Sequence, residues 1–245
     1  MNPSSQLEIE QMGCLGDLSA KQRPCSADRL QANDILLFAL AAAVCFFITK
    51  GTIVVLHSPD RGLPYADRFA TSDNAEWSAY GGNWKVEDGG MVNESNERGA
   101  KLVAGSAYWK DYVVQADVAL RSLGDAGILA RVSDPEQGVD AYRGIYVGLR
   151  IRDQGLVIGV ADHDWEEADT PSLSFPIVPN TWYHLQVKLE GCKVNATVNR
   201  DGSTQIGSKE ITLDSCPLQG KIGLRSYDSG GIWKNVRVTK LLASH

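Results

Sequence analysis

The sequence predicts an all-β sandwich of two packed antiparallel sheets, preceded by a single transmembrane helix. From about Tyr65 onward, short segments alternate apolar and polar side chains, and turn signals divide them into about ten to twelve strands. No stretch of this region has the period of a long amphipathic helix, which excludes an α/β fold with helical crossovers. One long apolar run stands before the β pattern and does not share its alternation.

The composition suits one folded domain behind a shorter N-terminal region. The chain has 245 residues and a formal net charge of −6. Once about 60 N-terminal residues are set aside, the remainder is long enough to bury a core of its own. The chain has no cluster of Lys and Arg with interleaved aromatic residues, which a nucleic-acid partner would require. We therefore expect no nucleic-acid partner.

The N-terminal region divides into a tail and an apolar run. Residues 1–34 show no apolar periodicity and are expected to form a flexible tail. Residues 35–56 are 22 mostly apolar positions. As a helix they would extend about 33 Å, which matches a hydrocarbon core of about 30 Å. Lys50 lies near one end, where its stem can reach the membrane interface. The sequence predicts a transmembrane helix over 35–56.

The apolar run has three other interpretations. A cleaved signal peptide has a short basic segment before its apolar part, whereas 34 mostly polar residues come first here. A lipoprotein signal places a small residue directly before a Cys that lies after the run, but Val44 precedes Cys45 in its middle. A buried helix of a globular protein remains as the alternative to a membrane span.

The orientation of the span is inferred mainly from the C-terminal part of the chain. Positive charges flank both sides, with Lys21, Arg23 and Arg29 before the span and Arg61 and Arg68 after it. This bias is slight. Asn-x-Ser/Thr sequons at Asn93 and Asn195, which matter in a eukaryotic source, favour an exported C-terminal part. We expect a single-pass protein with a cytoplasmic tail, a linker over 57–66 and an extracytoplasmic domain over 67–241.

Two cysteines of the C-terminal domain leave two interpretations open. Cys192 and Cys216 form a disulfide if the domain lies in an oxidising compartment. The alternative is a pair of free, half-buried thiols.

The alternation identifies the inward-facing side of several strands. The predicted inward sets are Val114, Ala116, Val118 and Leu120; Ile145, Val147, Leu149 and Ile151; Tyr183, Leu185, Val187 and Leu189; and Val194, Ala196 and Val198. Gly191-Cys192 is expected to be a tight connection between the last two sets, and Asp201-Gly202 is a further turn signal.

A family resemblance rests on motifs spread over this region. "WSAYGGNWKVEDGGMVNE" carries a Trp, a short gap and then G-x-W-x-V-x-x-G, and further matches are "YWKDYVVQADV", "AGILARV", "GIYVGLRI", "NTWYHLQVKLEG", "VNRDG" and "GKIGLRS…IWKNVRV". Together they resemble the concanavalin A-like lectin and glucanase superfamily, in its laminin-G-like and 3-keto-disaccharide hydrolase-type branch. The resemblance implies a jelly roll over 67–241. It leaves lectins, carbohydrate-binding modules, glycosidases and adhesion modules open as functions.

The acidic stretch "ADHDWEEAD" is the first candidate for chemistry. Laminarinase-type members of the superfamily place their catalytic carboxylates in an E-x-D-x-x-E pattern, and a retaining mechanism needs two carboxyl groups about 5 Å apart. The string Asp162-x-Asp164-x-Glu166 has a different spacing and begins with Asp. We therefore expect the end of a strand and a solvated or cation-binding loop, in which Trp165 contacts a ligand.

A second candidate is the sheet face opposite the apolar sets. Arg and Tyr side chains beside glycines can offer hydrogen-bond donors and a flat apolar surface, which are the features that sugars require. The resemblance implies that the glycan lies on the concave sheet. The predicted ligand-binding residues are Arg131, Tyr146, Arg150, Arg225 and Tyr227, together with Trp165. The alternative is that they are ordinary exposed residues of a β face.

The resemblance also raises the question of a metal ion. Superfamily members hold a structural Ca²⁺ between N- and C-terminal strands, where Asp67 would serve here, but Lys234 stands where an acidic residue would help. The four histidines show no ligand spacing, so we expect no catalytic metal or other cofactor.

The sequence therefore predicts a membrane-anchored, extracytoplasmic domain that binds glycan on its concave sheet. Two alternatives remain. One is a glycoside hydrolase of the 3-keto-disaccharide hydrolase type, and the other is a laminin-G-like module that binds a protein.

Overall fold

The computed structural model describes residues 62–70, 76–152, 154–168, 175–201 and 203–241. All of them belong to one compact unit, Ser58–His245. The predicted tail over 1–34, the predicted helix over 35–56 and most of the predicted linker lie outside the described residues. Among the residues that are described, no helix has the length and apolar character needed to cross a membrane.

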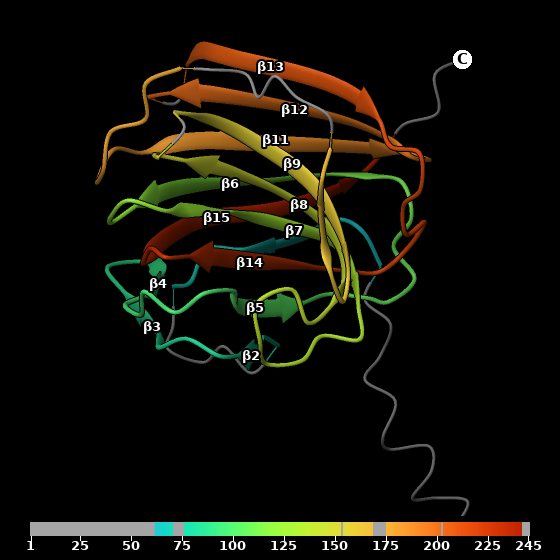
Figure 1. The fold of residues 1–245 in the computed structure, drawn as a ribbon, viewed down its shortest axis with the longest axis horizontal. Helices are drawn as coiled ribbons and strands as arrows, with labels where there is room; N and C mark the ends of the chain where they lie inside the picture. The colour runs from blue at the N-terminus through green and yellow to red at the C-terminus, as the bar shows by residue number, and fades with distance from the viewer. Residues whose placement is uncertain (1–61, 71–75, 153, 169–174, 202, 242–245) are drawn as a thin grey trace, which may run out of the picture. The chain divides into compact units, whose positions relative to one another are not determined.

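The described residues form two antiparallel sheets, as predicted (Figure 1). The eight-stranded sheet A has the order β13 (Thr204–Thr212), β12 (Lys193–Arg200), β11 (Tyr183–Glu190), β6 (Tyr112–Leu120), β15 (Gly231–Lys240), β4 (Gly90–Asn93) and β3 (Trp84–Glu87), with β1 (Tyr65–Asp67) paired to β15. The seven-stranded sheet B has the order β10 (Trp165–Glu167), β9 (Gly155–Asp162), β8 (Arg143–Arg150), β7 (Asp125–Ser133), β14 (Lys221–Tyr227), β5 (Ala100–Ala104) and β2 (Ser78–Tyr80). Strand β1 begins inside the range expected to be a linker.

The main core lies between the two sheets and contains every inward set predicted from the alternation. Strand β11 shows why, because buried and more exposed positions alternate along its whole length. It pairs with β6 on one side and with β12 on the other, so its apolar face is enclosed by neighbours of the same kind. A period of two along a strand places one set on each face, which makes this part of the fold readable from sequence.

Trp233 of β15 joins the two sheets through the core. Its side chain is fully buried, and its Nε1 donates a hydrogen bond of 3.0 Å to the carbonyl oxygen of Gly127 in β7. Its ring centroid lies 5.3 Å from that of Trp84. A Cβ at Gly231 would lie 2.4 Å from the Trp233 ring, so only glycine leaves room for the indole there.

The disulfide is present: Cys192 and Cys216 are bonded, with their Cα atoms 5.6 Å apart. Cys192 is next to Gly191 in the tight connection between β11 and β12, where Glu190 pairs with Lys193. Cys216 lies in the connection from β13 to β14. The bond therefore ties a hairpin of sheet A to the segment that leads into sheet B, and the interpretation as free thiols is wrong.

The structure corrects one of the two predicted glycosylation sites. Asn93 is fully buried, and its Nδ2 donates to the Ser226 hydroxyl at 2.9 Å. A glycan on that nitrogen would need the space that the other sheet occupies. Asn195 is partly exposed on β12, where its amide donates to Glu210. Of the two, Asn195 alone is accessible to modification in the folded domain.

Replacing Trp233 by Phe is expected to lower the free energy of unfolding by about 2 kcal/mol, because the variant loses buried volume and leaves the Gly127 carbonyl without its donor. Trp182→Phe is the matched control, since Trp182 is only partly buried and contacts Lys234 at the surface. Chemical denaturation of both variants measures the difference. Equal stability of the two would contradict the role given to the indole.

Candidate functional site

A pocket of about 290 Å³ opens on the outer face of sheet B, the face that points away from sheet A. Its lining residues come from the ends of β7, β8 and β14, from β10 and from the connections between strands: Gly124, Asp125, Asp140, Arg150, Arg152, Trp165, Arg225, Tyr227 and Asp228. Beside it the outer face is apolar and covered, because a second buried cluster includes Leu129, Tyr142 and Tyr146. The pocket is therefore a polar recess at the margin of an apolar surface.

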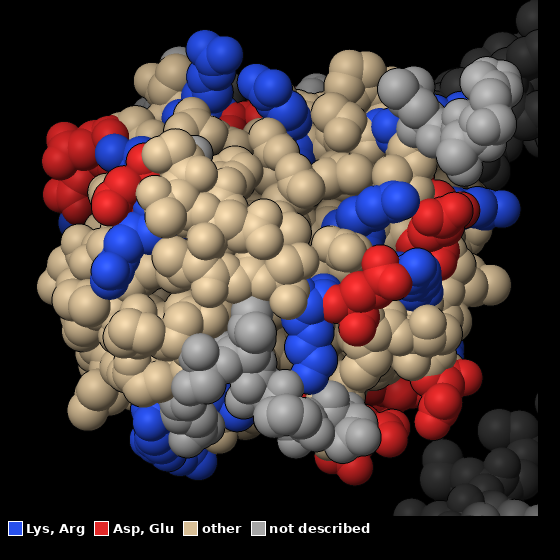
Figure 2. Space-filling model, turned by 90° about the horizontal axis from the view of Figure 1, so that it is seen from above, with Lys and Arg blue, Asp and Glu red and all other residues tan. Residues whose placement is uncertain are grey.

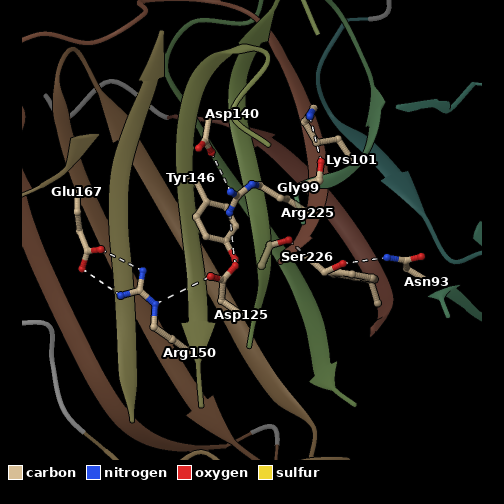
Figure 3. Close-up of polar contacts among 12 residues, drawn as sticks. Asn93, Gly99, Lys101, Asp125, Asp140, Tyr146, Arg150, Glu167, Arg225 and Ser226 are labelled. Atoms are coloured by element: carbon tan, nitrogen blue, oxygen red, sulfur yellow. Dashed lines mark hydrogen bonds and ion pairs between the residues drawn. The ribbon is translucent and has the colours of Figure 1, made fainter. Parts of the chain in front are cut away.

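Arg225 of β14 carries the central charge of the pocket, although the residue is only 4% exposed to solvent. Its guanidinium donates to Asp140 at 2.9 Å and to Asp125 at 3.4 Å, and it lies 4.6 Å from the centroid of the Tyr146 ring (Figure 3). Burial lowers the pKa of Arg225, but the surrounding tyrosines and aspartates outweigh it and raise the pKa overall. A buried guanidinium with two carboxylates and an aromatic face is held in one orientation.

Asp125 of β7 is nearly as buried as its partner, at 6% exposure. Its Oδ1 accepts a hydrogen bond of 2.7 Å from the Tyr146 hydroxyl, and its Oδ2 lies 3.9 Å from Nε of Arg150. Burial raises the pKa of Asp125, while Arg225 and Tyr146 act in the opposite direction without cancelling the shift. A carboxyl group with a raised pKa is a candidate proton donor or acceptor.

Arg150 connects this cluster to the hairpin that carries the acidic stretch. It contacts Glu167 through both terminal nitrogens, at 3.4 and 3.0 Å, as Figure 3 shows. The stretch forms the end of β9, a turn and the short edge strand β10, which pairs back onto β9. Asp162 forms an ion pair with Arg143 at 2.8 Å. Glu167 is thus committed to holding Arg150 in place.

Trp165 stands where the hairpin meets the pocket. Its ring lies 6.0 Å from that of Tyr146 and 5.8 Å from the Arg225 guanidinium, and it is partly exposed. A Cβ on Gly159 would lie 2.4 Å from the indole, so the glycine allows the ring to approach the backbone of β9 closely. Trp165 and Tyr227 are the aromatic members of the lining.

The structure brings five of the six predicted ligand-binding residues together. Arg150, Trp165, Arg225 and Tyr227 line the pocket, and Tyr146 lies buried directly beside it. The shared position results from strand order, because β8, β7 and β14 are neighbours. Strand β10 is separated from β8 by β9, and the Trp165 side chain reaches across β9 to the Tyr146 ring.

Arg131 is the exception, and its predicted place on the ligand-binding face is wrong. It is fully buried and donates to the carbonyl oxygens of Lys110, Gly191 and Pro217, at 2.9, 2.6 and 2.9 Å, and to Asp111 at 2.9 Å. The pairing of β7 with β8 shifts its register after Ala130, and Arg131 has a φ of +52°. A bulge thus interrupts the alternation and turns the side chain toward the disulfide.

Four acidic residues of the site were not predicted as site residues: Asp125, Asp140, Asp228 and Glu167. Their signals in the sequence differ. Asp228 directly follows β14, outside the alternating strand. Asp125, Gly127 and Leu129 are two residues apart along β7 and so share one face of the strand. The alternation that places Ile128 on the inward face therefore also places Asp125 on the outward face. Asp140 lies in the connection between β7 and β8, where periodicity gives no information. Glu167 has no sequence signal beyond its membership of an acidic stretch.

Within the described part of the chain, no group of three His, Cys, Asp or Glu side chains is placed to hold a metal ion. Asp67 accepts hydrogen bonds from the Trp77 indole at 2.8 Å and from the Phe69 backbone at 2.7 Å. Its role in calcium binding stays a prediction.

Replacing Tyr146 by Phe is expected to lower the free energy of unfolding by about 2 kcal/mol, because a buried carboxylate loses a hydrogen bond. Tyr142→Phe is a close control, because the Tyr142 hydroxyl is also buried but has no hydrogen-bond partner among the described residues. That variant should be neutral or slightly stabilising. Denaturant titration at neutral pH gives both values, and a larger loss in Tyr142→Phe would contradict this picture of the site.

The fold places the chain among concanavalin A-like jelly rolls. A carbohydrate-binding module, CBM66 from Bacillus subtilis, is 18% identical with a TM-score of 0.57, over 67% of this chain and 96% of that chain. A basic winged bean lectin is 8% identical with a TM-score of 0.55, over 72% and 97%. A Bacillus licheniformis β-glucanase is 11% identical with a TM-score of 0.51, over 74% and 99%.

The sequence comparison identifies the family. Residues 67–239 match the family described as the 3-keto-alpha-glucoside-1,2-lyase-like domain, and the chain belongs to it. No curated protein matches the chain. The matched range contains the whole lining of the pocket.

Proposed function

We propose that the pocket on sheet B binds an uncharged carbohydrate. The observation that carries the proposal is its lining, which combines the partly exposed rings of Trp165 and Tyr227 with carboxylate and guanidinium groups. An aromatic ring packs against the C–H face of a sugar, and fixed charged groups exchange hydrogen bonds with its hydroxyls. The groups are held in place before the ligand arrives, which lowers the entropic cost of binding.

The charge balance supports a neutral ligand. The lining holds three arginines and three aspartates. Arg225 and Arg150 contact carboxylates, and Asp228 forms an ion pair with Arg98 at 3.1 Å. A ligand with a net charge would disturb these pairs, whereas hydroxyl groups can join them as donors and acceptors. In Figure 2, acidic and basic side chains also lie interspersed on the described part of the face that it displays.

The family and the structural neighbours support the same class of ligand. The family is described as a 3-keto-alpha-glucoside-1,2-lyase-like domain, and the similar structures include a carbohydrate-binding module and a lectin. The neighbours share the fold at low identity, so the ligand of this chain is argued from its own pocket.

We further infer that the domain is exported and tethered by residues 35–56. The support is the length of that apolar run, which suits a membrane span. The Cys192–Cys216 bond is a second support, because disulfides persist in oxidising compartments.

The binding proposal is tested with the full-length chain on a panel of neutral, carboxylated and sulfated oligosaccharides. Trp165→Ala is expected to weaken binding of the best neutral glycan by about tenfold, since it removes the stacking surface. Trp182→Ala is the control, because Trp182 does not line the pocket. Tighter binding of acidic glycans, or full affinity after Trp165→Ala, would contradict the proposal.

A second candidate function is cleavage of a 3-keto-glucoside, favoured by Asp125 with its raised pKa. The ketone at C3 makes the proton on C2 acidic. A base can remove that proton, and the C2–H electron pair then forms the C2=C3 bond of an enolate whose charge lies on the C3 oxygen. When the carbonyl forms again, the C2=C3 pair becomes the C1=C2 double bond, the C1–O bond breaks, and the leaving alkoxide takes up the proton that the base has accepted. Asp125 is the base in this scheme, and Arg225 is a donor for the enolate oxygen.

This activity is tested with 3-keto-maltose and the full-length chain, by monitoring the absorbance of the unsaturated ketone product. Asp125→Asn is expected to lower the rate by at least about a hundredfold, because it removes the base. Maltose affinity should change much less, since the amide keeps the shape of the side chain. Turnover that survives Asp125→Asn would exclude Asp125 as the base. Absence of turnover by the unmodified chain would exclude the lyase activity and leave carbohydrate binding as the proposed function.

A further inference from the structure

The segment Asp134–Tyr142, called the strap here, connects β7 to β8 and lies across the outer face of sheet B. Although it joins adjacent strands, it contacts strands further along the sheet, whose order is β8, β7, β14, β5. Asp140 of the strap contacts Arg225 of β14, and Gly138 contacts Lys101 of β5. The strap therefore spans β14 and reaches β5.

The strap packs on β5 at backbone distance. A Cβ built on Gly99, which directly precedes β5 and has a φ of +76°, would lie 2.2 Å from the carbonyl oxygen of Val139. Any side chain at this position would displace the strap. Inside the strap, the Glu136 amide donates to the Ala141 carbonyl at 2.8 Å, which closes the segment on itself.

Lys101 is the charged group beneath the strap, and it is fully buried. Its Nζ donates to the carbonyl oxygens of Gly138 at 2.6 Å and Gly99 at 3.0 Å, and Figure 3 shows the contact with Gly99. It also lies 5.5 Å from the centroid of the Tyr142 ring, at the other end of the strap. A buried ammonium needs such partners, and here most of them belong to the strap.

Lys101 and Arg225 stand opposite each other on neighbouring strands. Two buried cations in this position repel each other, and both lie beneath the strap. It supplies the Gly138 carbonyl to Lys101 and the Asp140 carboxylate to Arg225, two residues apart in the chain. A strap that is held in place by Lys101 therefore also keeps the Asp140 carboxylate beside Arg225 in the pocket.

We propose that Lys101 is a positioning residue of the pocket: it fixes the strap across sheet B and so holds Asp140 against Arg225. The expected effect of Lys101 on ligand affinity rests on the proposed carbohydrate site. The expected effect of Lys101 on the order of the strap rests only on the contacts described above. Ligand affinity and strap order are therefore measured in separate experiments.

The titration of Lys101 gives the proposal a pH dependence. Burial first, and Arg225 second, lower the pKa of Lys101 to about 8, while Asp140 and Glu97 act in the opposite direction. The Tyr142 ring also faces the ammonium, and burial raises the pKa of its hydroxyl. Opening the strap would return Lys101 to water and restore its ordinary pKa, so the open strap binds a proton more tightly than the closed strap does. The strap is therefore expected to tighten as the pH rises from 7 to about 9.5, where Lys101 loses its proton only under the closed strap.

Hydrogen exchange of the full-length chain measures the strap without any ligand. In Lys101→Met, amides of the strap should exchange about tenfold faster at pH 7, and the pH-dependent tightening, after correction for the chemical exchange rate, should disappear. Lys188→Met is the control, because Lys188 is an exposed lysine on a strand of sheet A. Gly99→Ala should also speed exchange in the strap, since it displaces the strap without changing any charge.

Maltose affinity is measured on the same variants. Weaker binding by about tenfold in both Lys101→Met and Gly99→Ala, with faster strap exchange, supports the proposal. Unchanged exchange in both variants overturns it, as does faster exchange with unchanged affinity. If the unmodified chain binds neither maltose nor any glycan of the panel, the proposed function fails, while the exchange data still decide whether Lys101 orders the strap.

Discussion

The site depends on one constraint: Arg225 carries a charge on a sheet face that is almost wholly removed from water. Separating a guanidinium from water costs several kcal/mol unless charged and polar partners surround it. Asp140, Asp125 and the ring of Tyr146 supply those partners, and each comes from a different segment. The positions of β7, β8 and the strap are thereby fixed relative to β14. The pocket is the part of this arrangement that remains open to solvent.

The same constraint explains why the polar groups form a chain of contacts. Asp125 is shared between Arg225 and Tyr146, and Arg150 links it to Glu167 of the edge strand β10. Hydrogen bonds and ion pairs in a region of low dielectric are strong and hold their members in place. Among the described residues, the buried Nε of Arg225 has no hydrogen-bond partner, while its terminal nitrogens bind Asp125 and Asp140. A rigid constellation suits recognition of a ligand with hydroxyl groups at fixed positions. In the proposed lyase activity, Asp125 with its raised pKa is the member of this network that would act as the base.

The sequence predicts the sandwich and its core well, because regular strands obey a period of two. Alternate residues from Tyr183 to Leu189 and from Ile145 to Leu149 are predicted to face inward, and these alternate residues lie in the core between the sheets. Arg131 fails for a local reason, since a bulge changes the direction of its side chain. Asp140 and Lys101 could not be predicted, because their contacts depend on a connection that crosses strands distant in sequence. The anchor over 35–56 stays a prediction.

The hydrogen bonds that Arg131 donates to backbone oxygens determine which nearby positions can be substituted. Its guanidinium binds the backbone oxygens of Lys110 and Pro217, so the side chains at those positions contribute nothing to these bonds. Substitutions there leave the acceptors in place, whereas position 131 must supply several donors in a planar fork. Tolerance to substitution is therefore unequal among these contacting residues. Position 131 requires arginine, whereas positions 110 and 217 can accept other side chains without loss of these hydrogen bonds.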